Sequence, residues 1–138
     1  MATPDYLLLC EHATQSGPLL SMLNAGITQL AAELLPLLLP VTVVSRFYWD
    51  ADELGQAQVV AIRVEHPDGE RLANYETAVQ PPTAETPLWH HRESRAQLIN
   101  LALPLQVRRA AIYMVKVDVN GTTLMSSPLE VTTTLPQL

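Results

Sequence analysis

The stretch YMVKVDVNGTTLMSSPLEV (Tyr113–Val131) holds two strand-like runs on either side of Asn120 and Gly121. Both central residues tolerate the left-handed backbone conformation that a type I′ turn requires, so the stretch predicts an antiparallel β-hairpin. Side chains alternate between the two faces of a strand, and the first run therefore gathers its apolar residues on one face. These residues are Tyr113, Val115, Val117 and Val119.

A second hairpin is predicted in VAIRVEHPDGERLANYETAV (Val60–Val79), where Pro67, Asp68 and Gly69 supply the turn. Val60, Ile62 and Val64 alternate with polar or small residues before that turn. Three more runs are rich in strand-forming residues: Asp5–His12, Val41–Trp49 and Gln97–Leu103. We therefore expect one all-β domain over residues 1–138, a two-sheet antiparallel β-sandwich of seven or eight strands, either immunoglobulin-like or jelly-roll-like.

The segment from Pro18 to Leu35 permits two interpretations. Its leucines recur at helical spacing, and Ser16 with Pro18 suits a helix start. Gly26 in the middle disfavours that helix by about 1 kcal/mol relative to alanine. The alternative is a strand with a bulge near Gly26, followed by a loop or short turn from Ala31 to Leu35.

Four pieces in this order resemble a family of small bacterial proteins of unknown function: LLSMLNAGIT, LLPVTVVSRFYWDADELGQ, RVEHPDGERL and YMVKVDVNGTTL. The resemblance covers roughly residues 5–131 and implies a single β-sandwich domain. It favours the strand interpretation of the segment around Gly26, although this chain has one glycine there where relatives tend to have two or three. No activity and no catalytic residue follow from it.

Composition excludes several classes of protein. Hydrophobic residues make up 48% of the chain and charged residues 16%, which excludes general disorder. The net charge of −6 makes nucleic acid an unsuitable partner. The apolar run Leu34–Val44 is too short to cross a bilayer and contains two prolines. With a single cysteine, Cys10, and no secretion signal before it, we expect a cytoplasmic protein without a membrane partner or a cofactor.

A candidate ligand site lies at one predicted end of the sandwich. If successive connections reverse direction, the loop after Trp49 shares an end with the polar segment PLWHHRES (Pro87–Ser94) and with the Asn120–Gly121 turn. That end would carry aromatic, imidazole and carboxylate groups able to hold a small ligand: Trp49, Trp89, His90, His91 and Glu93. A divalent metal would use Asp50, Asp52 and His91.

Simpler interpretations compete with that site. Adjacent histidines in extended chain point to opposite sides, no H-x-H, H-E-x-x-H or complete calcium loop occurs, and a tryptophan at a strand end often closes the core. No nucleophile motif such as G-x-S-x-G is present, so we name no catalytic residue. PLWHHRES is then a polar connection between the strand ending near Val79 and the strand beginning near Gln97.

The leading function hypothesis is a non-catalytic binding or assembly module. It would act on a protein partner or another copy of itself, through an edge strand or an apolar patch. The candidate patch is the leucine-rich stretch Leu34, Leu35, Leu37, Leu38 and Leu39. The alternative is the metal- or small-ligand-binding site, possibly enzymatic, at the end carrying Asp50, Asp52, His90 and His91.

Overall fold

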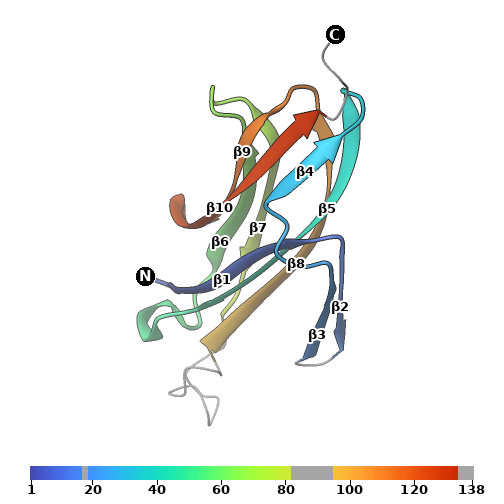
Figure 1. Ribbon diagram of the computed structural model, residues 1–138. Helices are drawn as coiled ribbons and strands as arrows, with labels where there is room; N and C mark the ends of the chain where they lie inside the picture. The colour runs from blue at the N-terminus through green and yellow to red at the C-terminus, as the bar shows by residue number, and fades with distance from the viewer. Residues whose placement is uncertain (17–18, 82–94, 134–138) are drawn as a thin grey trace.

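The computed structural model describes residues 1–16, 19–81 and 95–133, and these residues are almost entirely β-structure (Figure 1). Ten strands are assigned there, with one turn of 3₁₀ helix, η1, at Ala51–Glu53. The strands are β1 (Thr3–Cys10), β2 (His12–Ser16), β3 (Leu19–Leu23), β4 (Gln29–Ala32), β5 (Leu37–Tyr48), β6 (Gln58–Glu65), β7 (Arg71–Val79), β8 (Ala96–Val107), β9 (Ala111–Val119) and β10 (Thr122–Thr133).

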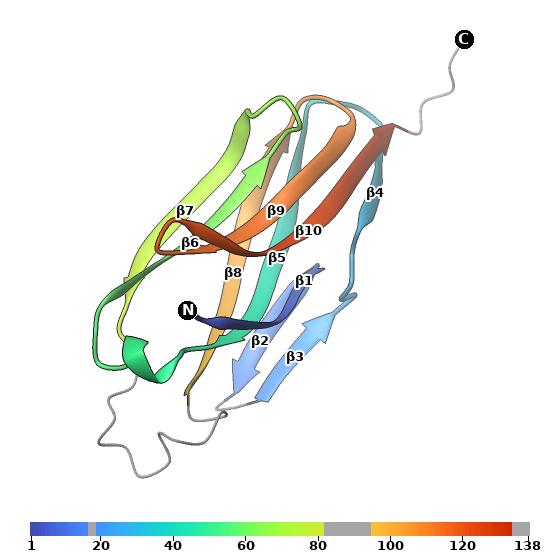
Figure 2. The ribbon, with the colours of Figure 1, turned by 90° about the vertical axis from the view of Figure 1, so that its left-hand side faces the viewer.

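The strands form a sandwich, which confirms the predicted fold class. A five-stranded sheet has the order β4-β10-β9-β6-β7, and a three-stranded sheet has the order β1-β5-β8. The long strands β5, β6, β7 and β8 run along the length of the molecule in Figure 2. Within the described residues the strand number is ten rather than seven or eight. One pair, β4 with β10, is parallel, which the antiparallel prediction did not include.

The segment around Gly26 forms two strands and no helix, so the strand interpretation is confirmed. Asn24 and Gly26 both adopt positive φ, of 51° and 88°, and this turn separates β3 from β4 rather than making a bulge within one strand. The backbone N–H groups of Gly26 and Ile27 donate to the carbonyl oxygen of Leu9 at 2.9 and 3.0 Å. The turn therefore lies against β1, on one side of the sandwich.

Both predicted hairpins are present. Asn120 and Gly121 have φ of 51° and 82°, so both occupy the left-handed region that the turn between β9 and β10 requires. At the turn between β6 and β7, the Gly69 N–H donates to the carbonyl oxygen of His66 at 2.9 Å. Residues two apart on these strands face inward together, as predicted. The core of the sandwich includes Val60, Ile62, Val64, Tyr113, Val115, Val117 and Val119.

The hairpin β2–β3 is a third layer that the sequence did not predict. It pairs in register from His12 with Leu23 to Ser16 with Leu19. A small apolar cluster of Cys10, Ala13 and Val44, with Leu20 packed against it, lies apart from the main core. The amide of Asn100 donates to the Ala13 carbonyl oxygen at 3.3 Å. The hairpin therefore covers the outer face of the three-stranded sheet.

Tyr113 links the core to the turn between β8 and β9. Its ring is buried, and its hydroxyl donates to the carbonyl oxygen of Arg109 at 2.6 Å. We expect Tyr113→Phe to lower the free energy of unfolding by about 1 kcal/mol, because the ring is kept while one hydrogen bond is lost. Urea denaturation measures this, and an unchanged midpoint would mean that the hydroxyl adds no stability.

None of the helical structure in the described residues has the length and apolar character that crossing a bilayer demands.

Candidate functional site

The predicted end of the sandwich does bring separate loops together. The Trp49 N–H donates to the carbonyl oxygen of Arg95 at 2.9 Å, which joins the end of β5 to the start of β8. The Asn120 N–H donates to the carbonyl oxygen of Val59 at 2.8 Å, so the turn between β9 and β10 lies at the start of β6. The predicted ligand residues Trp89, His90, His91 and Glu93 lie outside the described residues, as does the whole of PLWHHRES.

Trp49 is part of the core at this end. Its side chain is only 1% exposed, and its ring packs edge-on against Phe47 with 5.1 Å between ring centroids. The indole Nε1–H donates to the side-chain oxygen of Gln97 at 3.3 Å. In this position the ring has no exposed face on which a sugar or a peptide could stack, which corrects the ligand-binding role predicted for it.

The carboxylates after Trp49 cluster on η1. Asp50, Asp52 and Glu53 each bring one oxygen within 4.8 Å of the others. Local contacts already use two of the three: Asp50 pairs with the α-ammonium group of Met1, and Glu53 accepts the backbone N–H of Asp50 at 2.8 Å. The predicted ligands Asp50 and Asp52 are thus close together, although their arrangement is explained by capping of a short helical turn.

The leucine-rich stretch is divided between core and surface. Leu34 and Leu38 are 66% and 64% exposed, and Leu37 is exposed to a smaller extent. Leu35 and Leu39 pack against the core instead. The stretch therefore contributes separate exposed side chains, while two of the five predicted interface residues have a structural role.

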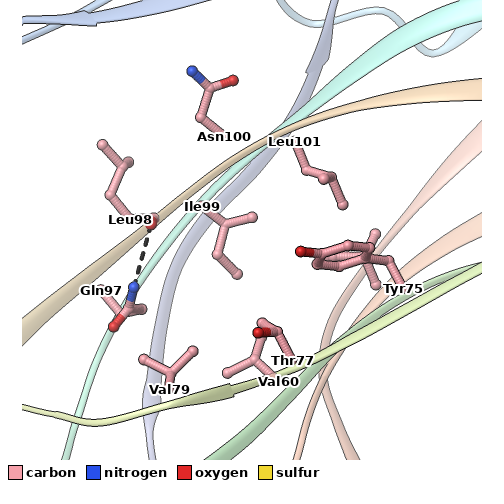
Figure 3. Close-up of a pocket in the computed structure, with 10 residues that line it drawn as sticks. Val60, Tyr75, Thr77, Val79, Gln97, Leu98, Ile99, Asn100 and Leu101 are labelled. Carbon is pink, nitrogen blue, oxygen red and sulfur yellow. Dashed lines mark hydrogen bonds between the residues drawn. The ribbon is translucent and has the colours of Figure 1, made fainter.

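A different feature lies between β7 and β8, the strands that end the two sheets on one side. A groove of about 190 Å³ runs between them (Figure 3). Ile99 and Leu101 point from β8 toward β7, whereas Leu98 and Asn100 point away. No charged residue is among the groove's described lining residues, which are Val60, Ile62, Tyr75, Thr77, Val79, Gln97, Leu98, Ile99, Asn100 and Leu101.

The groove exists because the core-facing side of β7 is uncovered. Tyr75 pairs with Ile62 and Thr77 with Val60, so these side chains share the face that is buried on β6. Nevertheless the Tyr75 side chain is 48% exposed, and Thr77 is exposed as well. The five-stranded sheet therefore extends past the three-stranded sheet on this side.

Neither Cys10 nor a nearby base forms a nucleophilic site in the described residues. The Cys10 side chain is fully buried between the three-stranded sheet and the β2–β3 hairpin. Burial raises the pKa of its thiol, and this outweighs a hydrogen bond with the His12 backbone that lowers it. The thiol is thus in its protonated, weakly nucleophilic form at neutral pH.

The sequence matches the model of DUF6941, a family of unknown function, over residues 5–132. The chain belongs to this family. The predicted resemblance to a family without an assigned activity is thereby confirmed over nearly the same span. A search of curated proteins finds no match to the sequence.

Solved structures similar to this DUF6941 chain share its fold at low sequence identity. One is the Pseudomonas fluorescens alkylpurine DNA glycosylase AlkC bound to DNA containing an abasic site analog, with a TM-score of 0.57 and 13% identity. The match covers 95% of this chain but only 30% of the glycosylase. Another is the C-terminal domain of wzt, with a TM-score of 0.50, 11% identity, and coverage of 99% of this chain and 75% of that one. These likenesses support the sandwich architecture alone.

The groove was missed in the sequence, although two of its signals are visible there. Ala73, Tyr75, Thr77 and Val79 recur at every second position, which places them on one face of a strand, opposite Asn74, Glu76 and Ala78. The run from Ala96 to Val107 contains no charged residue in twelve positions. Nothing in either pattern says which strands end the sheets, so the groove could not be located before the strand order was known.

Proposed function

We propose that this DUF6941 chain is a non-catalytic binding or assembly module that accepts a β-strand from a polypeptide at the β7–β8 side. The observation that carries the proposal is the uncovered, core-facing side of β7 at Tyr75 and Thr77. Strand addition supplies backbone hydrogen bonds along a sheet edge and side-chain contacts at alternate positions. The strand could come from a protein partner or from another copy of the chain.

The character of β8 supports the same proposal. Soluble proteins protect long edge strands with charged residues, prolines or bulges, because unpaired backbone groups invite pairing with other chains. No described strand pairs with the outer edge of β8, and β8 has no charge and one proline, Pro104. On the opposite side of the sandwich, by contrast, the turn at Gly26 and Ile27 bonds to β1. The edge of β8 thus has no described strand beside it and lies on the same side as the groove, with only the Gln97 side-chain amide bonded to its Leu98 carbonyl oxygen at 3.3 Å.

Photo-crosslinking tests this proposal. A benzophenone amino acid replaces Tyr75 in the groove, and in a control protein it replaces Ile112, which is 55% exposed on the outer face of the five-stranded sheet. Irradiation in the source organism is expected to give a discrete polypeptide adduct from position 75 and none from position 112. Adducts from position 112 alone would contradict the proposal.

The exposed leucines offer a second apolar surface for assembly. Leu34 and Leu38 are 66% and 64% exposed, more than Tyr75 in the groove, which is 48% exposed. The groove is favoured over them because it combines apolar side chains with a sheet edge, whereas Leu35 and Leu39 turn into the core. We place the module in the cytoplasm on the basis of its single, buried cysteine.

A divalent-cation site at Asp50, Asp52 and Glu53 is the alternative function. It rests on the clustering of their oxygens within 4.8 Å. Oxygen ligands of this kind suit calcium, magnesium or manganese. Calorimetric titration of the chain with each ion, beside Asp52→Asn, tests it: saturable binding to the unmodified chain that Asp52→Asn abolishes would favour this function, and absence of heat at millimolar ion would exclude it.

A further inference from the structure

The strand-accepting role proposed above leaves open which polypeptide enters the groove, and the backbone of β8 narrows the choice. Pro40 on β5 pairs with Pro104 on β8. Because neither proline has an N–H, this pair cannot exchange the two hydrogen bonds of a hydrogen-bonded antiparallel pair. It is a non-hydrogen-bonded pair, in which the backbone groups of Pro104 point away from β5.

The register between β5 and β8 has no shift, so every second residue before Pro104 repeats that orientation. The N–H and C=O groups of Leu98, Asn100 and Ala102 therefore point to the outer edge of β8. The carbonyl oxygen of Leu98 accepts a hydrogen bond from the Gln97 side-chain amide at 3.3 Å, and an added strand would have to replace that bond. Pro104 itself has no N–H to offer, and it ends the usable edge. An added strand can pair with roughly residues 96–102 of β8.

Side-chain positions then define what the strand must carry. A strand beside β8 directs alternate side chains toward β7, onto Tyr75, Thr77 and Val79. A charge placed there would lose its hydration without gaining a partner, because the lining residues are uncharged. The volume of about 190 Å³ is also below the range of about 300–1,000 Å³ that is typical of small-molecule pockets. The lining fits the side chains of one apolar, alternating strand.

The overhang of β7 argues against a second folded copy. In a two-fold dimer formed by antiparallel pairing of β8 with β8 of a second copy, each three-stranded sheet would extend over the other molecule's β7. Each copy also has a β7 that projects past its own β8, as the exposure of Tyr75 shows. The two projecting strands would compete for the same space. A single segment has no second layer and meets no such obstacle.

We therefore infer that the partner is one extended segment of a different polypeptide, uncharged at its inward-facing positions and apolar at alternate residues, which adds to β8 as a fourth strand. The twelve residues of β8 carry no charge, so the contact stretch of the segment meets no charged group on that strand.

The test uses the synthetic peptide KTVTVTVTK and its isomer KTTVVVTTK, which has the same composition without alternation. Each is titrated into the ¹⁵N-labelled chain. We expect saturable NMR shifts at Leu98, Asn100 and Ala102, with the alternating peptide binding about tenfold more tightly than its isomer. No saturation at millimolar peptide, or equal affinity for both peptides, would overturn the inference.

Two variants of β7 provide matched controls. Thr77→Lys places a charge in the groove, while Ala78→Lys places the same charge at the next residue, which is exposed on the opposite face. Thr77→Lys is expected to reduce affinity for the alternating peptide by at least about tenfold and Ala78→Lys by less than about threefold. Equal losses in the two variants would contradict binding in the groove.

The mass of the Tyr75 photo-adduct separates this inference from the proposed function. An adduct of twice the 15.2 kDa chain mass would identify a second copy, which would overturn the inference and leave the strand-accepting role standing. An adduct with a different polypeptide supports both only together with the tighter binding of KTVTVTVTK than of its isomer. If position 75 gives no adduct and the peptide does not bind, both fall.

Discussion

Replacing Phe47 with alanine is expected to lower the free energy of unfolding by about 3 to 5 kcal/mol, the typical cost of removing a buried aromatic ring. Phe47 is fully buried on β5 and supports Trp49 edge-on, so the substitution leaves a cavity under the tryptophan that closes this end of the core. Urea denaturation followed by circular dichroism measures the loss.

Tyr75→Ala is the matched control, since it also removes an aromatic ring from a strand. Its side chain is half exposed at the groove, and we expect a loss of about 1 kcal/mol or less. Similar losses in Tyr75→Ala and Phe47→Ala would mean that the β7 side is covered as well as the core is. That result would contradict the groove.

Asp118→Asn has the second largest expected effect. The Asp118 side chain is nearly buried on the outer face of the five-stranded sheet, where it pairs with Arg63 and accepts the Thr123 hydroxyl hydrogen at 2.8 Å. Arg63 also pairs with Glu65, and Lys116 donates to Glu65 at 3.1 Å. Breaking a fully buried ion pair costs about 3–5 kcal/mol. In Asp118→Asn the Arg63 guanidinium still has its ion pair with Glu65. We therefore expect a smaller loss in the free energy of unfolding, of about 2 to 3 kcal/mol at pH 7.

The same variant should alter the dependence of stability on pH. Burial raises the pKa of Asp118, but hydrogen bonds from Arg63 and Thr123 outweigh it and hold the pKa below its usual value. A carboxyl with a depressed pKa in the folded state adds stability above the unfolded pKa of about 4, and that stability is lost as the pH falls through the lower folded value. The stability of Asp118→Asn should therefore fall less on acidification than that of the original chain.

Urea midpoints at pH 7 and pH 3 measure this difference. Glu76→Gln, on the exposed part of β7, serves as the control, and we expect it to change stability by less than about 0.5 kcal/mol. If Asp118→Asn lost as much stability between pH 7 and pH 3 as the original chain, the Asp118 carboxylate would not contribute to the loss of stability at acidic pH.

Local chemistry explains which parts of the fold were predictable. The turns at Asn120–Gly121 and Gly69 depend on residues that accept positive φ. Strands β6 and β9 depend on apolar residues at every second position, which face the core together. The β2–β3 layer and the parallel β4–β10 pair depend on which distant strand each segment meets. No local pattern specifies that choice, so β2, β3 and β4 raised the strand number beyond the prediction.

The same distinction applies to the candidate site. Asp50 and Asp52 cluster because Asp50 is the N-cap of the single helical turn that contains Asp52, and sequence spacing could predict that. Trp49 and Tyr75 are both aromatic residues on strands, yet one closes the core and the other lines an open groove. The two roles differ because the five-stranded sheet is wider than the three-stranded sheet. That difference in width follows from the strand order, and neither aromatic residue reveals it.

Amide hydrogen exchange of β8 in the unliganded chain tests the central claim most directly. An unpaired edge predicts alternation along the strand: Ile99 and Leu101, whose N–H groups face β5, should exchange on the order of a hundredfold more slowly than Leu98, Asn100 and Ala102. Uniform protection of all five amides would mean that this edge is already paired, and the strand-accepting groove would have to be abandoned.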